Sequence, residues 1–212
     1  MNRRLCVGLA MLVALAAAGT SNAETLLGKN YVEGAFGIVQ FGDDVLDEVL
    51  GDGYEMRGAW NLNLNPNIDV NLGLGYLWAD GSAGGIEADV TGLEASAVLI
   101  YFFKPNEPVN PYVGAVLLVD KTEVELSTLG VSDDEDDTEA GIGAGAGVEI
   151  EATEDILVRL GVDYIYVDDD ESFDVTASVG YWFNEQVLGA IGGGYDFESE
   201  DLSAEVKLVV KL

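Results

Sequence analysis

The feature that most constrains this chain is an alternation of apolar and polar residues with a period of two. It is clearest at the C-terminus, where one face of an extended segment would hold only apolar residues: Leu202, Ala204, Val206, Leu208, Val210 and Leu212. Glu205 and Lys207 fall on the other face. Because a strand turns successive side chains to opposite sides, this pattern indicates a β-strand with one apolar and one polar face.

The same alternation recurs along most of the chain. It is clear in residues 54–64, 68–78, 139–151, 156–167 and 173–183, and weaker in 30–41, 90–103, 112–124 and 187–197. With the C-terminal segment, this predicts about ten strands, eight being the alternative, each near the ~10 residues that a tilted strand needs to cross a bilayer. The sides of 30–41 stay unassigned, because this segment has no clear apolar face against which to place Glu33.

Periodicity alone does not say whether the apolar faces point inward, as in a soluble barrel or sandwich, or outward toward lipid. Connection lengths favour a membrane barrel, which has short turns at one end and longer loops at the other. Short connections are expected at 65–67, 104–111, 152–155 and 184–186. Longer loops are expected at 42–53, 79–89 and 125–138, with modest ones at 168–172 and 198–201.

Aromatic and acidic residues favour the same arrangement. When the strands run alternately up and down, rings on the apolar face gather near the two strand ends, as in the interfacial girdles of membrane barrels. One expected girdle includes Tyr76, Trp78 and Tyr164, and the other includes Tyr101 and Tyr181. The acidic runs all fall at the end with the longer loops. We therefore expect an all-β, antiparallel, up-and-down transmembrane β-barrel with acidic extracellular loops.

The first 23 residues have the pattern of a cleaved secretory signal peptide. Arg3 and Arg4 precede an apolar run from Leu5 to Ala18, which is shorter than a membrane-spanning helix, and Ser21-Asn22-Ala23 supplies small residues for cleavage. The expected organisation is a signal peptide over 1–23 and a single barrel over 24–212. The only cysteine, Cys6, lies in the signal peptide, so no disulfide is expected in the barrel.

Composition excludes several functions. The formal net charge of -30 argues against nucleic-acid binding, which needs clustered basic residues. The chain has no His, the most common general base, and no other nucleophile–base pair is evident, so we expect no enzyme activity and no cofactor. The acidic run Asp133, Asp134, Glu135, Asp136 and Asp137 is a weak metal candidate, because it lacks the glycine and ligand spacing of a calcium loop.

A barrel of eight to ten strands has a narrow interior that side chains nearly fill. The polar faces carry both signs of charge, and we expect a paired network in the lumen made of Glu55, Arg57, Glu94, Arg159, Asp163, Glu205 and Lys207. Four alternating glycines (Gly141, Gly143, Gly145 and Gly147) would leave room for long side chains from facing strands. The alternative is that the same charges line a thin solute path.

With these features, the chain resembles the small Gram-negative outer-membrane β-barrels of the OmpA/OmpX/OmpW-like superfamily. The resemblance covers the whole chain after the signal peptide, from Tyr31-Val32-Glu33-Gly34 to the terminal strand, although Leu212 stands where these barrels usually end in an aromatic. It implies an outer-membrane location, contacts with lipid and lipopolysaccharide, and assembly by the barrel-insertion machinery. We expect a monomer with both termini in the periplasm.

Two functions follow from this reading. The first is a structural or surface-interaction role, and the alternative is a narrow, porin-like channel for small solutes. A soluble periplasmic barrel is the third possibility, and it requires the apolar faces to point inward.

Overall fold

The computed structural model describes residues 25–41, 50, 52–83, 86–104, 107–128, 131–167 and 170–212. These form ten strands: β1 (Tyr31–Gln40), β2 (Asp52–Asn65), β3 (Ile68–Ala83), β4 (Ile86–Phe102), β5 (Val109–Thr128), β6 (Val131–Glu151), β7 (Ile156–Val167), β8 (Asp170–Trp182), β9 (Val187–Asp196) and β10 (Leu202–Lys211). The predicted signal peptide lies outside the described residues and stays a prediction. Within those residues, no helix has the length and apolarity to cross a membrane.

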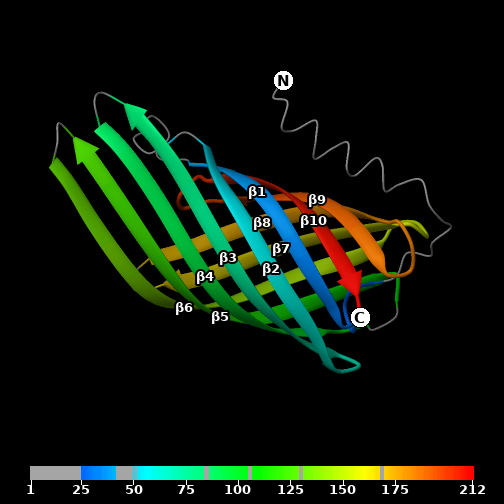
Figure 1. The fold of residues 1–212 in the computed structure, drawn as a ribbon. Helices are drawn as coiled ribbons and strands as arrows, with labels where there is room; N and C mark the ends of the chain where they lie inside the picture. Colours follow the sequence, from blue (N-terminus) through cyan, green and yellow to red (C-terminus); the bar gives the residue numbers. More distant parts are fainter. Residues whose placement is uncertain are drawn as a thin grey trace.

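The ten strands form one closed antiparallel barrel (Figure 1). Each strand pairs with its neighbours in sequence, and β1 pairs with β10 to close the sheet, in a register that runs from Tyr31 opposite Lys211 to Gln40 opposite Leu202. Closure leaves no strand edge unpaired. The predicted all-β, antiparallel, up-and-down barrel of about ten strands is therefore confirmed.

Two of the expected long loops are strands instead. The segments 79–89 and 125–138 belong mostly to β3–β4 and β5–β6, and these two hairpins project well beyond the rest of the barrel (Figure 1). β5 and β6 have 20 and 21 residues. The alternation of apolar and polar residues is irregular there, while the backbone pairing between the strands continues. The sequence Gly84-Gly85 between β3 and β4, typical of a two-residue hairpin, was the missed signal.

The two ends of the barrel therefore differ. We call the end with the projecting β3–β4 and β5–β6 hairpins the long-hairpin end. The opposite end, where β2–β3, β4–β5, β6–β7 and β8–β9 connect, is the short-turn end, and these connections agree with the expected short turns. Both the start of β1 and the C-terminus lie at the short-turn end (Figure 1).

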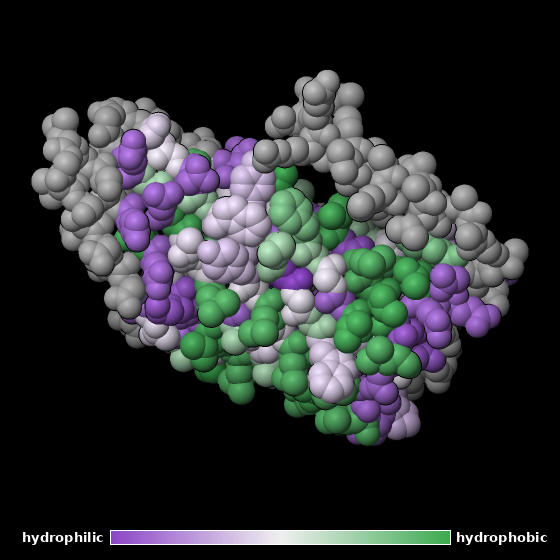
Figure 2. Space-filling view, in the orientation of Figure 1, coloured by the Kyte–Doolittle hydropathy of each residue, from purple (hydrophilic) through white to green (hydrophobic). Residues whose placement is uncertain are grey.

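The apolar faces of the strands point outward. Many large apolar side chains on the barrel exterior are exposed, and Leu74, Leu117 and Ile142 are each more than half exposed. Figure 2 shows apolar residues gathered on the outer wall, with hydrophilic ones toward both ends. A soluble barrel would bury these faces, so this distribution contradicts the soluble alternative.

Aromatic rings on the exterior cluster at two levels. At the long-hairpin end, Tyr54 and Tyr76 each stack on Trp78, with ring centroids 5.9 and 5.8 Å apart. At the short-turn end, Tyr101 packs edge-on against Phe103 at 5.1 Å. Amphipathic rings in two bands fit two membrane–water interfaces.

The structure also assigns the two faces of β1. Tyr31, Glu33 and Gly37 point into the barrel, and Val32 and Phe36 point outward and are exposed. The sequence pattern was ambiguous here because the inward face includes Tyr31, a large aromatic that is almost fully buried. Its burial depends on a segment that enters the lumen from outside the strands.

Candidate functional site in the barrel lumen

Charged side chains that the alternation placed on the polar faces lie inside the barrel, where several form ion pairs. Arg57 bonds Glu55 on the same strand, β2. On β10, Lys207 Nζ lies 2.7 Å from Glu205 Oε1. Residues two apart on a strand share one face, so these two pairs are local contacts along a strand.

Arg159 forms a pair between strands, with a partner that the sequence analysis did not include. Its Nη2 and Nε lie 2.6 and 3.2 Å from Oε2 of Glu149, which faces Arg159 directly in the β6–β7 register. The Glu149 side chain is fully buried. Alternation already placed Glu149 on a polar face, but the strand register that brings it to Arg159 is not readable from the sequence.

The two remaining predicted residues lie nearer the long-hairpin end. Glu94 shares a row with Arg57, because both stand opposite Gly75 in neighbouring pairings. Asp163 stands opposite Asp174, which stands opposite Asp196, so three acids from three strands follow one another. The Ser172 hydroxyl donates to both Asp174 and Asp196, at 2.9 and 2.8 Å. Asp163 therefore lies in an acidic row rather than beside a basic partner.

The wall formed by β6 and β7 is lined by glycines, which give space to side chains of adjacent strands. Tyr112 of β5 lies over Gly147 and Gly161, and a Cβ at Gly147 would collide with its hydroxyl. Asp163 of β7 occupies the space beside Gly145 in the same way. The long side chains thus come from the flanking strands, whereas the sequence analysis expected them from facing ones.

This packing predicts that Gly147→Ala destabilises the barrel. The added Cβ would meet the backbone oxygen of Leu160 as well as Tyr112, and the backbone cannot move aside without disturbing the sheet. We expect a loss of about 1–3 kcal/mol in the free energy of unfolding, measured by urea titration in detergent. Gly114→Ala is the matched control, because its Cβ would make only ordinary contacts at 3.5 Å. Equal stability of the two variants would contradict the packing argument.

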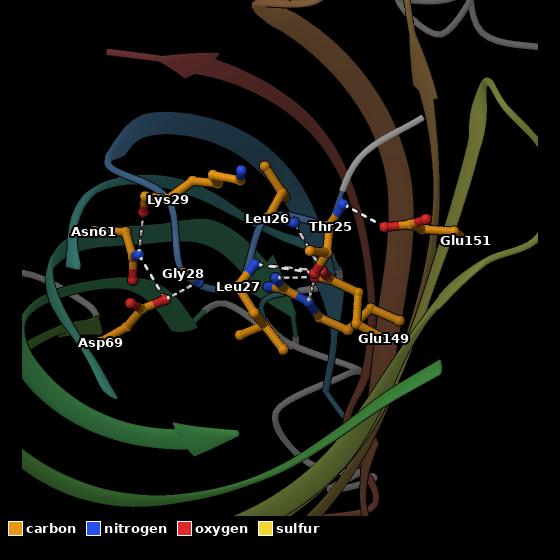
Figure 3. Close-up of polar contacts among 10 residues, drawn as sticks. Thr25, Leu26, Leu27, Gly28, Lys29, Asn61, Asp69, Glu149 and Glu151 are labelled. Carbon is orange, nitrogen blue, oxygen red and sulfur yellow. Dashed lines mark hydrogen bonds and ion pairs between the residues drawn. The ribbon is translucent and has the colours of Figure 1, made fainter. Parts of the chain in front are cut away.

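A short segment before β1 folds back into the lumen at the short-turn end (Figure 3). We call residues 25–29 the plug. Thr25, Leu26 and Leu27 are buried, although they belong to no strand. All five backbone N–H groups of the plug are hydrogen-bonded, and Lys29 N–H donates to the Leu26 carbonyl at 3.2 Å. The plug was not anticipated, because the irregular stretch 25–30 carries no periodic signal.

Glu149 holds the first half of the plug. Its Oε1 accepts the N–H groups of Leu26 and Leu27, at 2.7 and 3.3 Å, and the hydroxyl of Thr25. Glu151 accepts the N–H of Thr25 at 2.8 Å. The other oxygen of Glu149 binds Arg159, so one buried carboxylate joins the plug to the charged lumen.

Asp69 holds the second half from the opposite wall. Its Oδ2 accepts the N–H of Gly28 at 2.8 Å, and it also accepts a hydrogen bond from Asn61, whose amide donates to the Lys29 carbonyl. Gly28 has φ of 79°, a left-handed conformation that favours glycine. A Cβ there would also lie 3.3 Å from the Phe102 ring.

Apolar side chains complete the closure. Leu26 and Tyr31 pack with Leu157, Trp182 and Leu188 in a buried cluster at the short-turn end. Immediately next to this cluster is a small cavity lined by both apolar and charged residues: Leu26, Glu33, Leu157, Arg159, Ser178, Leu188, Ala190, Lys207 and Val209. The plug residue Leu26 thus belongs to the buried cluster and also lines the cavity. A second apolar cluster (Leu50, Ala79 and Ala88) lies toward the long-hairpin end.

The acidic run 133–137, the weak metal candidate, lies in a strand and not in the expected loop. Residues 133–137 lie in β6, so the expected acidic loop is an extended strand, opposite residues 122–126 of β5. An extended strand does not wrap its residues around one point as a calcium loop does. Across the residues whose placement is described, no cluster of three or more acidic, Cys or His side chains has metal-binding geometry.

Comparisons with known proteins agree with this architecture. Residues 7–183 match the family described as outer membrane protein beta-barrel domain. Among solved structures, Neisserial surface protein A is 19% identical over 86% of this chain and 97% of its own, with a TM-score of 0.40. The N-terminal barrel of Pseudomonas aeruginosa OprF is 19% identical over 87% and 99%, with a TM-score of 0.37.

The beta domain of the Bordetella autotransporter Brka is 11% identical over 87% of this chain and 99% of its own, with a TM-score of 0.52. That likeness supports the barrel fold. No curated protein matches the chain.

Proposed function

Because the chain belongs to the outer membrane protein beta-barrel family, and is therefore an outer-membrane protein, we propose that it acts there as a closed barrel with a structural and surface-interaction role. The observation that carries this proposal is the plug. It is buried in the lumen at the short-turn end and held by Glu149 and Asp69 from two sides. A barrel sealed in this way provides an envelope scaffold rather than a standing pore.

The proposed membrane placement follows from the exterior. The apolar belt between the two aromatic bands faces the acyl chains, because charges on that surface would be costly. The short turns and both termini lie in the periplasm after removal of residues 1–23. The β3–β4 and β5–β6 hairpins then project from the cell.

The projecting hairpins supply the interaction surface. In their register, Asp80 stands opposite Asp89, and Asp89 stands opposite Glu125. Like charges placed directly opposite each other destabilise a sheet unless salt or a bound partner compensates them. We propose that this acidic surface contacts cations and, through them, the phosphates of lipopolysaccharide.

The remaining proposals concern partners and chemistry. A monomer is proposed because the closed barrel leaves no strand edge for pairing with a second copy. We also propose insertion by the barrel-assembly machinery. We propose no enzyme activity and no cofactor, because the chain lacks His and the lumen charges of the described residues are engaged in pairs or acidic rows.

Planar-bilayer recording tests the closed state. The refolded mature protein should show no discrete openings at neutral pH, with a ten-strand porin of known conductance as the positive control. Regular single-channel steps from the unmodified protein would refute the closed-barrel proposal and favour the narrow channel. Heat-dependent electrophoretic mobility should confirm that the silent protein is folded.

A further inference from the structure

We propose that the plug is releasable, and that its release opens a narrow path through the barrel that is selective for small cations. This inference starts from the proposed closed barrel and adds an activity that the closed state hides. The path would run from the long-hairpin end, past the buried apolar cluster of Leu50, Ala79 and Ala88 and the charged mid-lumen, to the short-turn end where the plug now sits.

The seal consists of contacts that water or ions can replace. Two carboxylates, Glu149 and Asp69, accept the N–H groups of Leu26, Leu27 and Gly28. Apolar burial adds Leu26 and Leu27, which are both 4% exposed. The plug takes no part in the strand pairing of the barrel, since β1 begins at Tyr31 and pairs with β2 and β10 from that residue onward. The plug can therefore leave without breaking the sheet.

A small cavity lies in the lumen behind the plug. The cavity beside Leu26 is lined by Glu33, Arg159 and Lys207 as well as by apolar residues, and a dry structural core would not need these charges. Gly145, Gly147 and Gly161 keep the β6–β7 wall thin, and Tyr112 is the large side chain that lies against it. Removing the plug would connect this cavity to the short-turn end.

Charge determines what such a path would carry. The described inward-facing positions beyond the plug hold the bases Arg57, Arg159 and Lys207. The acids there are more numerous: Glu33, Glu55, Glu94, Asp120, Asp163, Asp174, Asp196 and Glu205. A narrow lumen with excess negative charge concentrates cations and repels anions.

Gly28 offers a way to release the plug without touching a strand. A β-branched residue is strongly disfavoured at φ of 79°, and its Cβ would press on Phe102. Gly28→Val should therefore displace the plug and produce discrete openings in a planar bilayer, which the unmodified protein lacks. The matched control is Gly34→Val in β1, where a Cβ would meet nothing within 4 Å.

Deletion of residues 24–29 from the mature chain is the second variant, because it removes the plug rather than straining it. Both variants should show openings whose reversal potential in a KCl gradient indicates cation selectivity, while Gly34→Val stays silent. A direct readout uses Leu26→Cys in the chain without its signal peptide, which then holds one thiol. A polar maleimide should label that thiol slowly, and at least about tenfold faster when Gly28→Val is added.

The outcomes separate this inference from the proposed function. Openings in the unmodified protein would refute the closed barrel itself. Silence of both plug variants, when electrophoretic mobility shows that they are folded, would overturn the releasable plug and leave the closed barrel standing. Openings that prefer anions would overturn the assigned selectivity.

Discussion

Replacing Glu149 with alanine should lower the free energy of unfolding by about 3–5 kcal/mol, the usual cost of removing one partner of a buried ion pair. The variant leaves the Arg159 guanidinium without its partner and strips the acceptor from the N–H groups of Leu26 and Leu27. Chemical unfolding in detergent, followed by tryptophan fluorescence, measures the change.

Arg159→Leu and Glu154→Gln are the comparison variants for the stability of Glu149→Ala. Arg159→Leu should cost less than Glu149→Ala, because Glu149 keeps its hydrogen bonds to the plug. Glu154 lies exposed in the short turn after β6 and should tolerate replacement by glutamine with little change. If Glu149→Ala were as stable as Glu154→Gln, the buried carboxylate would not be holding the plug and the lumen together.

Leu117→Arg should cost about 2–4 kcal/mol in lipid vesicles, the penalty for arginine near the bilayer midplane of a β-barrel. Leu117 is 61% exposed on the outer face of β5, within the apolar belt. In a soluble protein, a charge at so exposed a position would change stability by no more than about 0.5 kcal/mol. The measurement is the urea midpoint of reversible unfolding in vesicles.

The control introduces arginine outside the apolar belt of the barrel exterior. Glu87→Arg changes an exposed position on the projecting part of β4, opposite Ser82 and Ser127. It should be nearly neutral in vesicles. A Leu117→Arg cost no larger than that of Glu87→Arg would mean that the apolar exterior does not face lipid.

Comparison of particular segments shows where sequence reasoning failed. In 79–89 and 125–138, apolar and polar residues do not alternate regularly although the strand pairing continues there, and the segments were taken for loops. In 30–41, Tyr31 is apolar and inward because the plug covers it, so the alternation was ambiguous. Both failures arise because local alternation does not reveal strand pairing between irregular segments or burial by a segment outside the strand.

The ion pairs in the lumen could likewise be predicted only in part from the sequence. Alternation alone placed Glu55, Arg57, Arg159, Glu205 and Lys207 inside the barrel, and the pairs Arg57–Glu55 and Lys207–Glu205 need only their spacing along one strand. The contact between Arg159 and Glu149 needs the β6–β7 register, and the acidic row through Asp163 needs two registers. Whether these charges stabilise the barrel stays a prediction.

The amino-acid sequence by itself indicated the class of the protein: about ten strands, most of them apolar on one side, with aromatic rings near their ends. Those properties are local, since they depend on period two and on composition, and each strand carries them alone. Only the tertiary structure decided which charges meet and that residues 25–29 fold into the lumen. Some of those contacts are far apart in sequence, such as that between Leu26 and Glu149, more than 120 positions apart, and all of them need the strand register and barrel closure that bring the strands together.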